Sequence, residues 1–261
     1  MKIIYDFGAS DGKNIPYYLL KSDLIVAVEA NPNLVDNINE KFKKEIIEKK
    51  LVVLNYIISN ETTEDLKDFY IHKTNHHLST TNPYNNITDN YNKIKLKSKN
   101  ATEIINEFGK PFYVKIDIEN QDHLILENLF LSKIIPPYIS AEAHDIKVLT
   151  LMSALGRYES FKLVIGSDVE KKYKDHKIKT NNNTIEYSFP HHSAGPFGND
   201  INGPWLTLNN LFQPLAYLNH GWVDIHCSNI DKSDSDYKPT IEVKVISGKN
   251  NASQVKIIPK I

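Results

Sequence analysis

The stretch YDFGASDG, residues 5–12, follows a short apolar run that begins at Lys2 and precedes a segment typical of a helix from about Asn14. A strand that runs into a glycine-containing turn and then into a helix is a common arrangement for binding a nucleotide. Gly8 and Gly12 carry no Cβ, so the backbone can turn sharply there and approach a ligand closely. We therefore expect this stretch to set both the fold and the ligand site.

The acidic residues around this loop argue against a phosphate ligand. Dinucleotide folds use G-x-G-x-x-G to place pyrophosphate at a helix N-terminus, whereas this loop reads G-x-x-x-G, with Asp6 and Asp11 beside it. The next apolar run ends in Glu29, where an acidic side chain can accept hydrogen bonds from both ribose hydroxyls. A nucleoside without phosphate, S-adenosylmethionine, suits these residues best. The alternative is that Asp6 and Glu29 are merely solvated carboxylates at strand ends.

Composition is typical of a soluble globular protein. The 261 residues are 41% hydrophobic and 24% charged, and no apolar run approaches the roughly 18 residues of a membrane span. A formal net charge of -1 gives no general attraction to nucleic acid, so we expect neither a nucleic-acid partner nor a membrane span.

The cysteine content and the N-terminus bear on location. Cys227 is the single cysteine, so no intrachain disulfide can form, and no signal peptide is recognisable. We therefore expect a cytoplasmic protein. Because the first predicted strand begins beside Met1, we also hypothesise that the chain is a domain of a longer, glycan-modifying polypeptide.

Hydrophobic periodicity predicts alternating strands and helices. The predicted strands cover residues 24–29, 51–58, 66–72, 112–118, 138–143 and 161–165. The predicted helices cover residues 14–22, 33–50, 101–108, 121–132 and 146–155. This order predicts a single domain of the α/β class, whose core of about residues 1–165 is an open, mostly parallel Rossmann-like sheet with helices on both faces.

Two regions interrupt the pattern. Residues 73–92 form a long polar stretch that contains His76 and His77, and a loop of this length is usually functional or disordered. Residues 166–222 include HHSAGPFGNDINGPW, 191–205, which we interpret as an insertion or lid that closes over the acceptor side of the site. The histidine pairs in both regions are expected on loop surfaces or against an acceptor. Strand-like runs at residues 221–227 and 240–248 close the chain.

Charged residues end two of the predicted strands. They are Lys115, Asp117, Glu119, Glu142 and His144. Because the carboxyl ends of parallel strands meet at one sheet edge, we expect these side chains to converge. Three structural alternatives stay open: Asp117 and Glu119 as a helix-capping pair, Lys115 as a buried cation paired with Asp117, and His144 as a surface histidine.

Taken together, these segments resemble the FkbM family of class I S-adenosylmethionine-dependent methyltransferases. The resemblance covers about residues 2–165 and rests on DFGASDG, VEANP at 28–32, KIDIENQDHLIL at 115–126 and EAH at 142–144. It departs from the family at Asn120, where glycine is usual, and at Asp11, where asparagine is common. The resemblance implies O-methyl transfer to a hydroxyl of a sugar, glycan or glycolipid. The expected cofactor contacts are Asp6, Gly8, Ala9, Asp11, Gly12, Glu29, Ala30, Asn31, Ile57 and Asp117.

Methyl transfer from a sulfonium needs an aligned acceptor and a group that removes its hydroxyl proton. We predict that His144 is this base, because an unperturbed histidine has a pKa of about 6.5 and is largely neutral at pH 7. Glu142 or Asp117 would orient the imidazole, and Lys115 would balance the carboxylate charge. A carboxylate, Asp117 or Glu119, is the alternative base.

Other functions stay open. Asp117, Glu142 and His144 would suit Mg²⁺ or Mn²⁺, but methyl transfer needs no metal, so no metal site is predicted. A nicotinamide-dependent oxidoreductase would share the loop and Glu29, although the central glycine of its fingerprint is missing here. A non-catalytic S-adenosylmethionine-binding module is the third reading.

Overall fold

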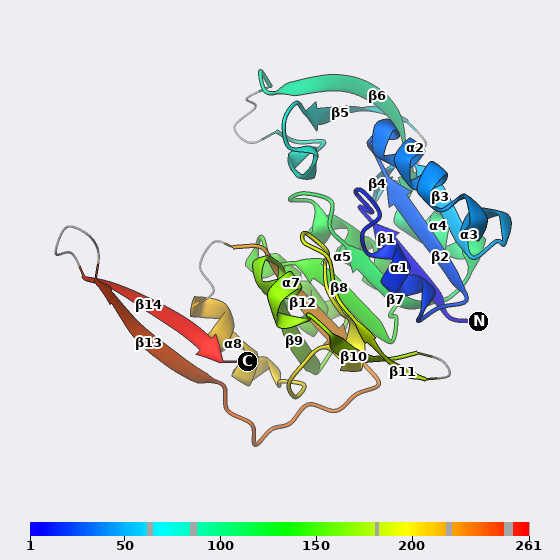
Figure 1. Cartoon of the computed structure of the whole chain (residues 1–261). Helices are drawn as coiled ribbons and strands as arrows, with labels where there is room; N and C mark the ends of the chain where they lie inside the picture. Colours follow the sequence, from blue (N-terminus) through cyan, green and yellow to red (C-terminus); the bar gives the residue numbers. More distant parts are fainter. Residues whose placement is uncertain (62–64, 84–87, 181–182, 218–220, 248–252, 261) are drawn as a thin grey trace.

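The computed structural model describes residues 1–61, 65–83, 88–180, 183–217, 221–247 and 253–260 (Figure 1). Within these residues the main sheet has seven strands. Their spatial order is β3 (Leu51–Asn55), β2 (Leu24–Glu29), β1 (Ile3–Phe7), β7 (Pro111–Ile116), β8 (Tyr138–Glu142), β12 (Val223–Ser228) and β9 (Ser160–Ile165). The first five run parallel, whereas β12 is antiparallel to both of its neighbours. The predicted open, mostly parallel sheet is confirmed.

Alternate residues of the strands enter two separate cores, as the period of a strand requires. In β1, Tyr5 and Phe7 pack on one face and Ile4 packs on the other. The first face carries α4 (Ala101–Phe108), α5 (Asp122–Leu131), α6 (Ile146–Thr150) and α8 (Leu208–Tyr217). The second face carries α1 (Ile15–Leu19), α2 (Pro32–Lys41), α3 (Lys43–Ile47) and α7 (Val169–Lys172). Helices therefore cover both faces, as expected.

Caps fix where the helices begin. Asn100 accepts a hydrogen bond from the Thr102 backbone N–H at 2.7 Å, which starts α4 at the predicted residue. The predicted helix 33–50 is instead two helices, because the backbone leaves helical geometry at Phe42, whose ring is buried in the core. The predicted helix 146–155 continues from α6 into a π-helix, Leu151–Leu155.

A second sheet lies above the main sheet in the view of Figure 1, with the strand order β4 (Ile57–Ser59), β6 (Tyr91–Asn100) and β5 (Leu66–His72). The predicted strand 51–58 is therefore divided between two sheets. β6 was not predicted, because its outward lysines hide the apolar alternation. The β5–β6 connection carries a short 3-10 helix, η1 (His76–Leu78).

The region between β9 and β12 contains η4 (Gly166–Asp168), β10 (His176–Lys179), β11 (Thr184–Tyr187) and η5 (Gly198–Asp200). Residues 191–205, interpreted from the sequence as part of an insertion or lid, are mostly buried in the core. Phe197 is buried and stacks on Tyr113, with ring centroids 4.1 Å apart, and Asn14 Oδ1 accepts a hydrogen bond from the Ala194 N–H at 2.9 Å. The exposed His192 of this loop lies beside His77 of η1, with ring centroids 5.2 Å apart.

The C-terminal strands β13 (Thr240–Ser247) and β14 (Ser253–Lys260) form a separate antiparallel hairpin, which projects from the body in Figure 1. Throughout the described ranges, no helix is both long and apolar enough to cross a bilayer.

Candidate active site

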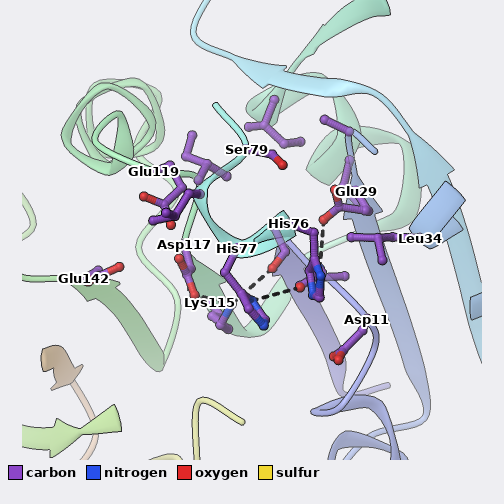
Figure 2. Close-up of a pocket in the computed structure, with 18 of the residues that line it drawn as sticks. Asp11, Glu29, Leu34, His76, His77, Ser79, Lys115, Asp117, Glu119 and Glu142 are labelled. Atoms are coloured by element: carbon purple, nitrogen blue, oxygen red, sulfur yellow. Dashed lines mark hydrogen bonds and ion pairs between the residues drawn. The ribbon is translucent and has the colours of Figure 1, made fainter. Parts of the chain in front are cut away.

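A cavity of about 370 Å³ opens at the carboxyl ends of β1, β2, β7 and β8. The strand order reverses between β1 and β7, since β2 and β3 lie on one side and β8 on the other. Ligands of open α/β sheets bind at such a reversal. The first loop forms one wall, the loop after β7 forms another, and His76 and His77 of η1 lie across the opening (Figure 2).

The first loop needs glycine at residue 8 for a packing reason. Gly8 has φ of +84°, and a Cβ there would lie 1.8 Å from the backbone oxygen of Asp117. The ends of β1 and β7 therefore touch at this point, so a side chain would disturb the sheet edge as well as the ligand. Gly12 lies outside the cavity, against Ile15 and Ile38.

Glu29 ends β2 and lines the cavity while remaining only 8% exposed. Its Oε2 accepts a hydrogen bond from the Ser10 N–H at 2.8 Å, and its Oε1 accepts one from the Asn31 N–H at 2.7 Å. Burial raises the pKa of this carboxyl to about 7, although the two N–H groups oppose the rise. A carboxylate has about four acceptor positions, so the two that remain can receive hydroxyl groups.

An apolar slot adjoins Glu29. It is lined by Ala30, Leu34, Tyr56, Ile57, Ile58 and Phe69. The Asn55 side-chain N–H₂ donates to the backbone oxygens of Glu29 and Ala30, which fixes the turn after β2. A flat, weakly polar ring next to a ribose would suit this slot and the carboxylate together.

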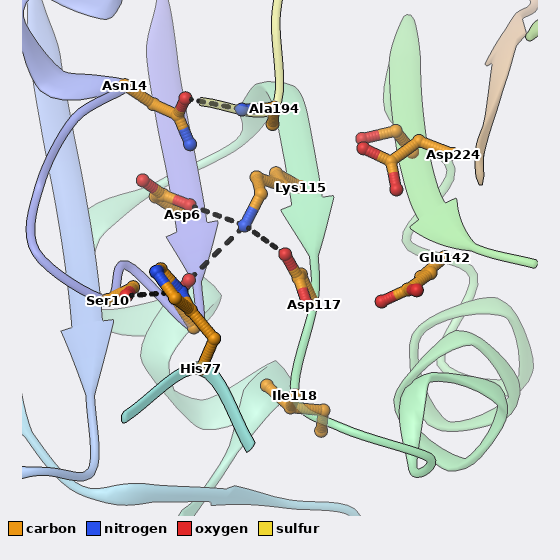
Figure 3. A network of polar contacts seen from close by, with 12 residues as sticks. Asp6, Ser10, Asn14, His77, Lys115, Asp117, Ile118, Glu142, Ala194 and Asp224 are labelled. Atoms are coloured by element: carbon orange, nitrogen blue, oxygen red, sulfur yellow. Dashed lines mark hydrogen bonds and ion pairs between the residues drawn. The ribbon is translucent and has the colours of Figure 1, made fainter. Parts of the chain in front are cut away.

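Lys115 is the buried centre of a polar network (Figure 3). Its Nζ lies 3.1 Å from Asp117 Oδ2, 3.5 Å from Asp6 Oδ1 and 3.2 Å from the Gly8 oxygen. Although burial alone lowers it, Asp117 and Asp6 raise the pKa of Lys115 well above its usual range. The structural alternative for Lys115, pairing with Asp117, is therefore confirmed. Asp6 is fully buried and does not line the cavity, so its expected ligand contact is replaced by the contact with Lys115.

Glu142 and His144 form an ion pair, with 2.9 Å between Oε2 and Nε2. The hydrogen bond from Glu142 raises the pKa of His144 to about 9. The pairing therefore favours the protonated form of the imidazole. The prediction of His144 as base assumed an unperturbed pKa, and this pairing contradicts that assumption.

Glu119 lies in an unusual backbone segment. Glu119 and Asn120 have φ of +56° and +67°, two consecutive left-handed residues. Asparagine tolerates this conformation better than most residues, which accounts for its presence where the FkbM resemblance expects glycine. Within the described ranges the Glu119 carboxylate has no hydrogen bond or ion pair. Burial, and then the charges of Asp117 and Glu142, raise its pKa to about 8.

Four histidines from two distant segments lie close together, and three of them, His76, His77 and His192, line the cavity. Ring centroids lie 4.1 Å apart for His76 and His77, 5.2 Å for His77 and His192, and 3.9 Å for His191 and His192. His77 also lies 3.4 Å from the Ser10 hydroxyl. Burial, followed by the neighbouring imidazoles, lowers the pKa of His77. The sequence marked both pairs but held no signal that they would touch.

The predicted site residues divide into those that line the cavity and those that do not. All five predicted catalytic residues line the cavity, and so do the expected cofactor contacts Gly8, Ala9, Asp11, Glu29, Ala30, Ile57 and Asp117. Asp6, Gly12 and Asn31 lie behind it; Asn31 instead caps α2. Lining residues that sequence reasoning missed include Ser10, Leu34, Phe69, Gln121 and Trp222. In the part of the chain that the structure describes, no group of three or more His, Cys, Asp or Glu side chains is arranged to hold a metal ion.

No protein-family model matches this sequence, and the search of curated proteins found no match either. Among solved structures, the chain is similar to the methyltransferase FkbM from Methylobacillus flagellatus KT, with 15% identity and a TM-score of 0.44 over 62% of this chain. This chain spans only 39% of that protein.

Two further solved structures are similar over most of the chain. The C-terminal domain of precorrin-6Y C5,15-methyltransferase from Rhodobacter capsulatus has 12% identity and a TM-score of 0.39, over 87% of this chain and 79% of that one. A putative RNA methyltransferase from Pyrococcus horikoshii has 13% identity and a TM-score of 0.36, over 89% of this chain and 75% of that one.

Proposed function

We propose that this protein is an S-adenosylmethionine-dependent O-methyltransferase that acts on a hydroxyl of a sugar or glycan-type acceptor. The charge pattern of the cavity is the observation that carries the proposal. Its carboxylates are Asp11, Glu29, Asp117, Glu119 and Glu142, and its two lysines are already paired, Lys13 with Asp11 at 2.9 Å and Lys115 with Asp117. Among the described residues, Glu29 and Glu119 have no ion-pair partner, and no lining lysine is left free to bind pyrophosphate. This favours a sulfonium nucleoside over a nicotinamide dinucleotide.

The residues present fit the parts of S-adenosylmethionine. Glu29 would hold the ribose, the apolar slot that contains Leu34 and Ile57 would hold the adenine, and Gly8 with Asp117 would face the methionine part. When bound, S-adenosylmethionine supplies an electrophilic methyl group. The rest of the chemistry falls to the side chains of this chain.

Proton removal from the acceptor is assigned to Glu119. Its carboxylate is unpaired among the described residues, and a pKa of about 8 makes it a stronger base than an ordinary carboxylate. The protonated His144, held by Glu142, would donate a hydrogen bond that orients the acceptor. This assignment replaces the neutral-histidine base and retains the predicted cluster.

The sheet provides independent support. The open, mostly parallel sheet, in which β12 lies antiparallel between β8 and β9, agrees with the fold that the FkbM resemblance implies. Parts of all four segments that carry the FkbM resemblance line one cavity at the strand reversal.

The test first compares the binding of two cofactors, and then compares methyl transfer by the parent protein and by a variant at Glu119. Thermal melting should show stabilisation of the protein by S-adenosylmethionine and none by NAD. Labelled S-adenosylmethionine with a panel of glycans should then yield a methylated product, and the Glu119→Gln variant should keep the melting shift while losing turnover. Stabilisation by NAD would favour the oxidoreductase. Stabilisation by S-adenosylmethionine without transfer to any hydroxyl would favour a binding module.

A further inference from the structure

A second cavity of about 490 Å³ adjoins the first one. The two share Glu142, His144 and Trp222, so the ion pair forms part of the wall between them. The remaining lining residues of the second cavity are Ala143, Asp145, Ile146, Leu149, Leu215, Gly221, Val223 and Ile225. They come from the end of β8, the start of α6, helix α8 and the start of β12.

The second cavity is apolar away from the shared wall. Leu149, Val223 and Ile225 belong to the core, and Ile146, which is 60% exposed, stands where a ligand could enter from solvent. Asp145 is already engaged, because its Oδ1 accepts the Lys147 N–H at 3.0 Å as the cap of α6. The side-chain polar atoms that remain to meet a ligand are therefore Oε1 of Glu142 and Nδ1 of His144, both in the shared wall.

The charges of this cavity do not suit an anionic ligand. His144 is the single lining residue in the described ranges that carries positive charge, and Glu142 neutralises it at 2.9 Å. A phosphate or a nucleic-acid backbone would find no free cation here, whereas an uncharged ligand with an apolar part would bury it at a gain.

Trp222 is held rigidly between the two cavities. Its Nε1–H donates to the buried Asp224 Oδ1 at 3.1 Å. A Cβ on Gly166 would lie 2.0 Å from the indole ring, so the ring packs directly on the Gly166 backbone. The indole therefore offers a fixed aromatic surface at the junction between the shared wall and the apolar chamber.

We propose that the second cavity binds an apolar substituent of the acceptor. The acceptor is then an uncharged sugar that carries an alkyl or aryl group, with its reacting hydroxyl at the shared wall beside Glu142 and His144. This inference rests on the proposed methyl transfer for the role of the ligand. The cavity itself can be tested separately, by binding.

The experiment measures binding of methyl, hexyl and phenyl glycosides of glucose, galactose and mannose by calorimetry, with S-adenosylhomocysteine present to prevent turnover. For at least one of the three sugars, the hexyl or phenyl glycoside should bind at least about tenfold more tightly than the methyl glycoside, because burial of two methylene groups suffices for that gain. Equal affinities, or no binding of any glycoside, would overturn the inference.

Matched variants locate the effect. Ile146→Gln and Leu215→Gln place an amide in the second cavity, and Ile230→Gln is the control, since Ile230 is 59% exposed and lines neither cavity. The first two variants should reduce the hexyl-to-methyl ratio to near one, whereas the control should keep it. An unchanged ratio in all three variants would place the apolar group elsewhere. Melting with S-adenosylmethionine in the same variants separates a failure of this inference from a failure of the proposed function.

Discussion

Two carboxyl groups at the carboxyl edge of the sheet, the buried Glu29 and the partly buried Glu119, differ in how they are held. Glu29, after β2, has a raised pKa of about 7 and two backbone N–H partners. Glu119, after β7, has a raised pKa of about 8 and no partner among the described side chains and backbone groups. The first is fixed in place before a ligand arrives, as binding requires. The second has no hydrogen bond that offsets its desolvation, so its pKa stays raised, which suits a group that accepts a proton.

The largest expected effect is that of replacing Glu119, the carboxyl group without a hydrogen-bond partner among the described residues. Glu119→Gln keeps the shape of the side chain but removes the proton acceptor, so turnover should fall by about 10² to 10⁴. The affinity for S-adenosylmethionine, measured by calorimetry, should change little. If His144→Ala loses that much turnover while Glu119→Gln does not, the imidazole is the base and the comparison of the two carboxylates fails.

The pH dependence should be nearly as large. The proposed roles need Glu119 ionised and His144 protonated. Burial raises the pKa of Glu119 to about 8, and the hydrogen bond from Glu142 raises that of His144 to about 9. kcat/KM should therefore rise as the pH increases through about 8 and fall above about 9, with about a hundredfold loss at two pH units below the lower pKa. A rate profile with a single rise near pH 6.5 would instead indicate a neutral, unperturbed His144.

The fixed carboxylate should affect binding more than turnover. Glu29→Ala removes the acceptor for the ribose hydroxyls, whose charge-assisted hydrogen bonds are each worth about 1.5 to 3 kcal/mol. The affinity for S-adenosylmethionine should fall by at least about tenfold in calorimetry. Glu29→Gln is the matched control, since it retains one acceptor oxygen and should lose less. Unchanged affinity in both variants would remove Glu29 from the cofactor site.

The smallest expected effect concerns the backbone that carries Glu119. Asn120 has φ of +67°, which glycine adopts without strain, so Asn120→Gly should change the free energy of unfolding by at most about 1 kcal/mol. Turnover should stay close to that of the parent. Asn120→Val is the contrasting variant, because a β-branched residue is strained in this conformation and should shift Glu119. Equal activity of both variants would show that this turn does not position the carboxylate.

The sequence was most informative where parallel strands end. Gly8, Glu29 and Asp117 could be placed at one cavity because consecutive βα units bring their carboxyl ends to the same edge. The raised pKa of His144 follows from a side chain two residues away, but its size depends on burial that residue spacing does not reveal. Residue spacing also could not predict the contact between the two histidine pairs, because they lie far apart in the chain and the folding of the chain brings them together.

Loop composition was the least informative signal. The glycines and prolines correctly predicted that most of residues 191–205 lack regular structure. They could not show whether the loop is exposed to solvent or buried in the core. Its buried Phe197 and Trp205 decide the matter, because they pack on the sheet. In β6 the error was the opposite one. Its outward lysines hid the alternation of a strand, so no strand was predicted where a long one exists.

The position of β12 has a consequence for how the protein is made. β9 joins the sheet through β12, which also covers the edge of β8, the strand that carries Glu142. A chain still emerging from the ribosome can pair β1, β2, β3, β7 and β8 as they appear, but β9 must wait until Val223–Ser228 has been synthesised. Until then β8 presents an open edge that invites pairing with another chain. The part of the site around Gly8 and Glu29 can thus take shape during translation, whereas the part beside Glu142 is completed only when Val223–Ser228 pairs with β8.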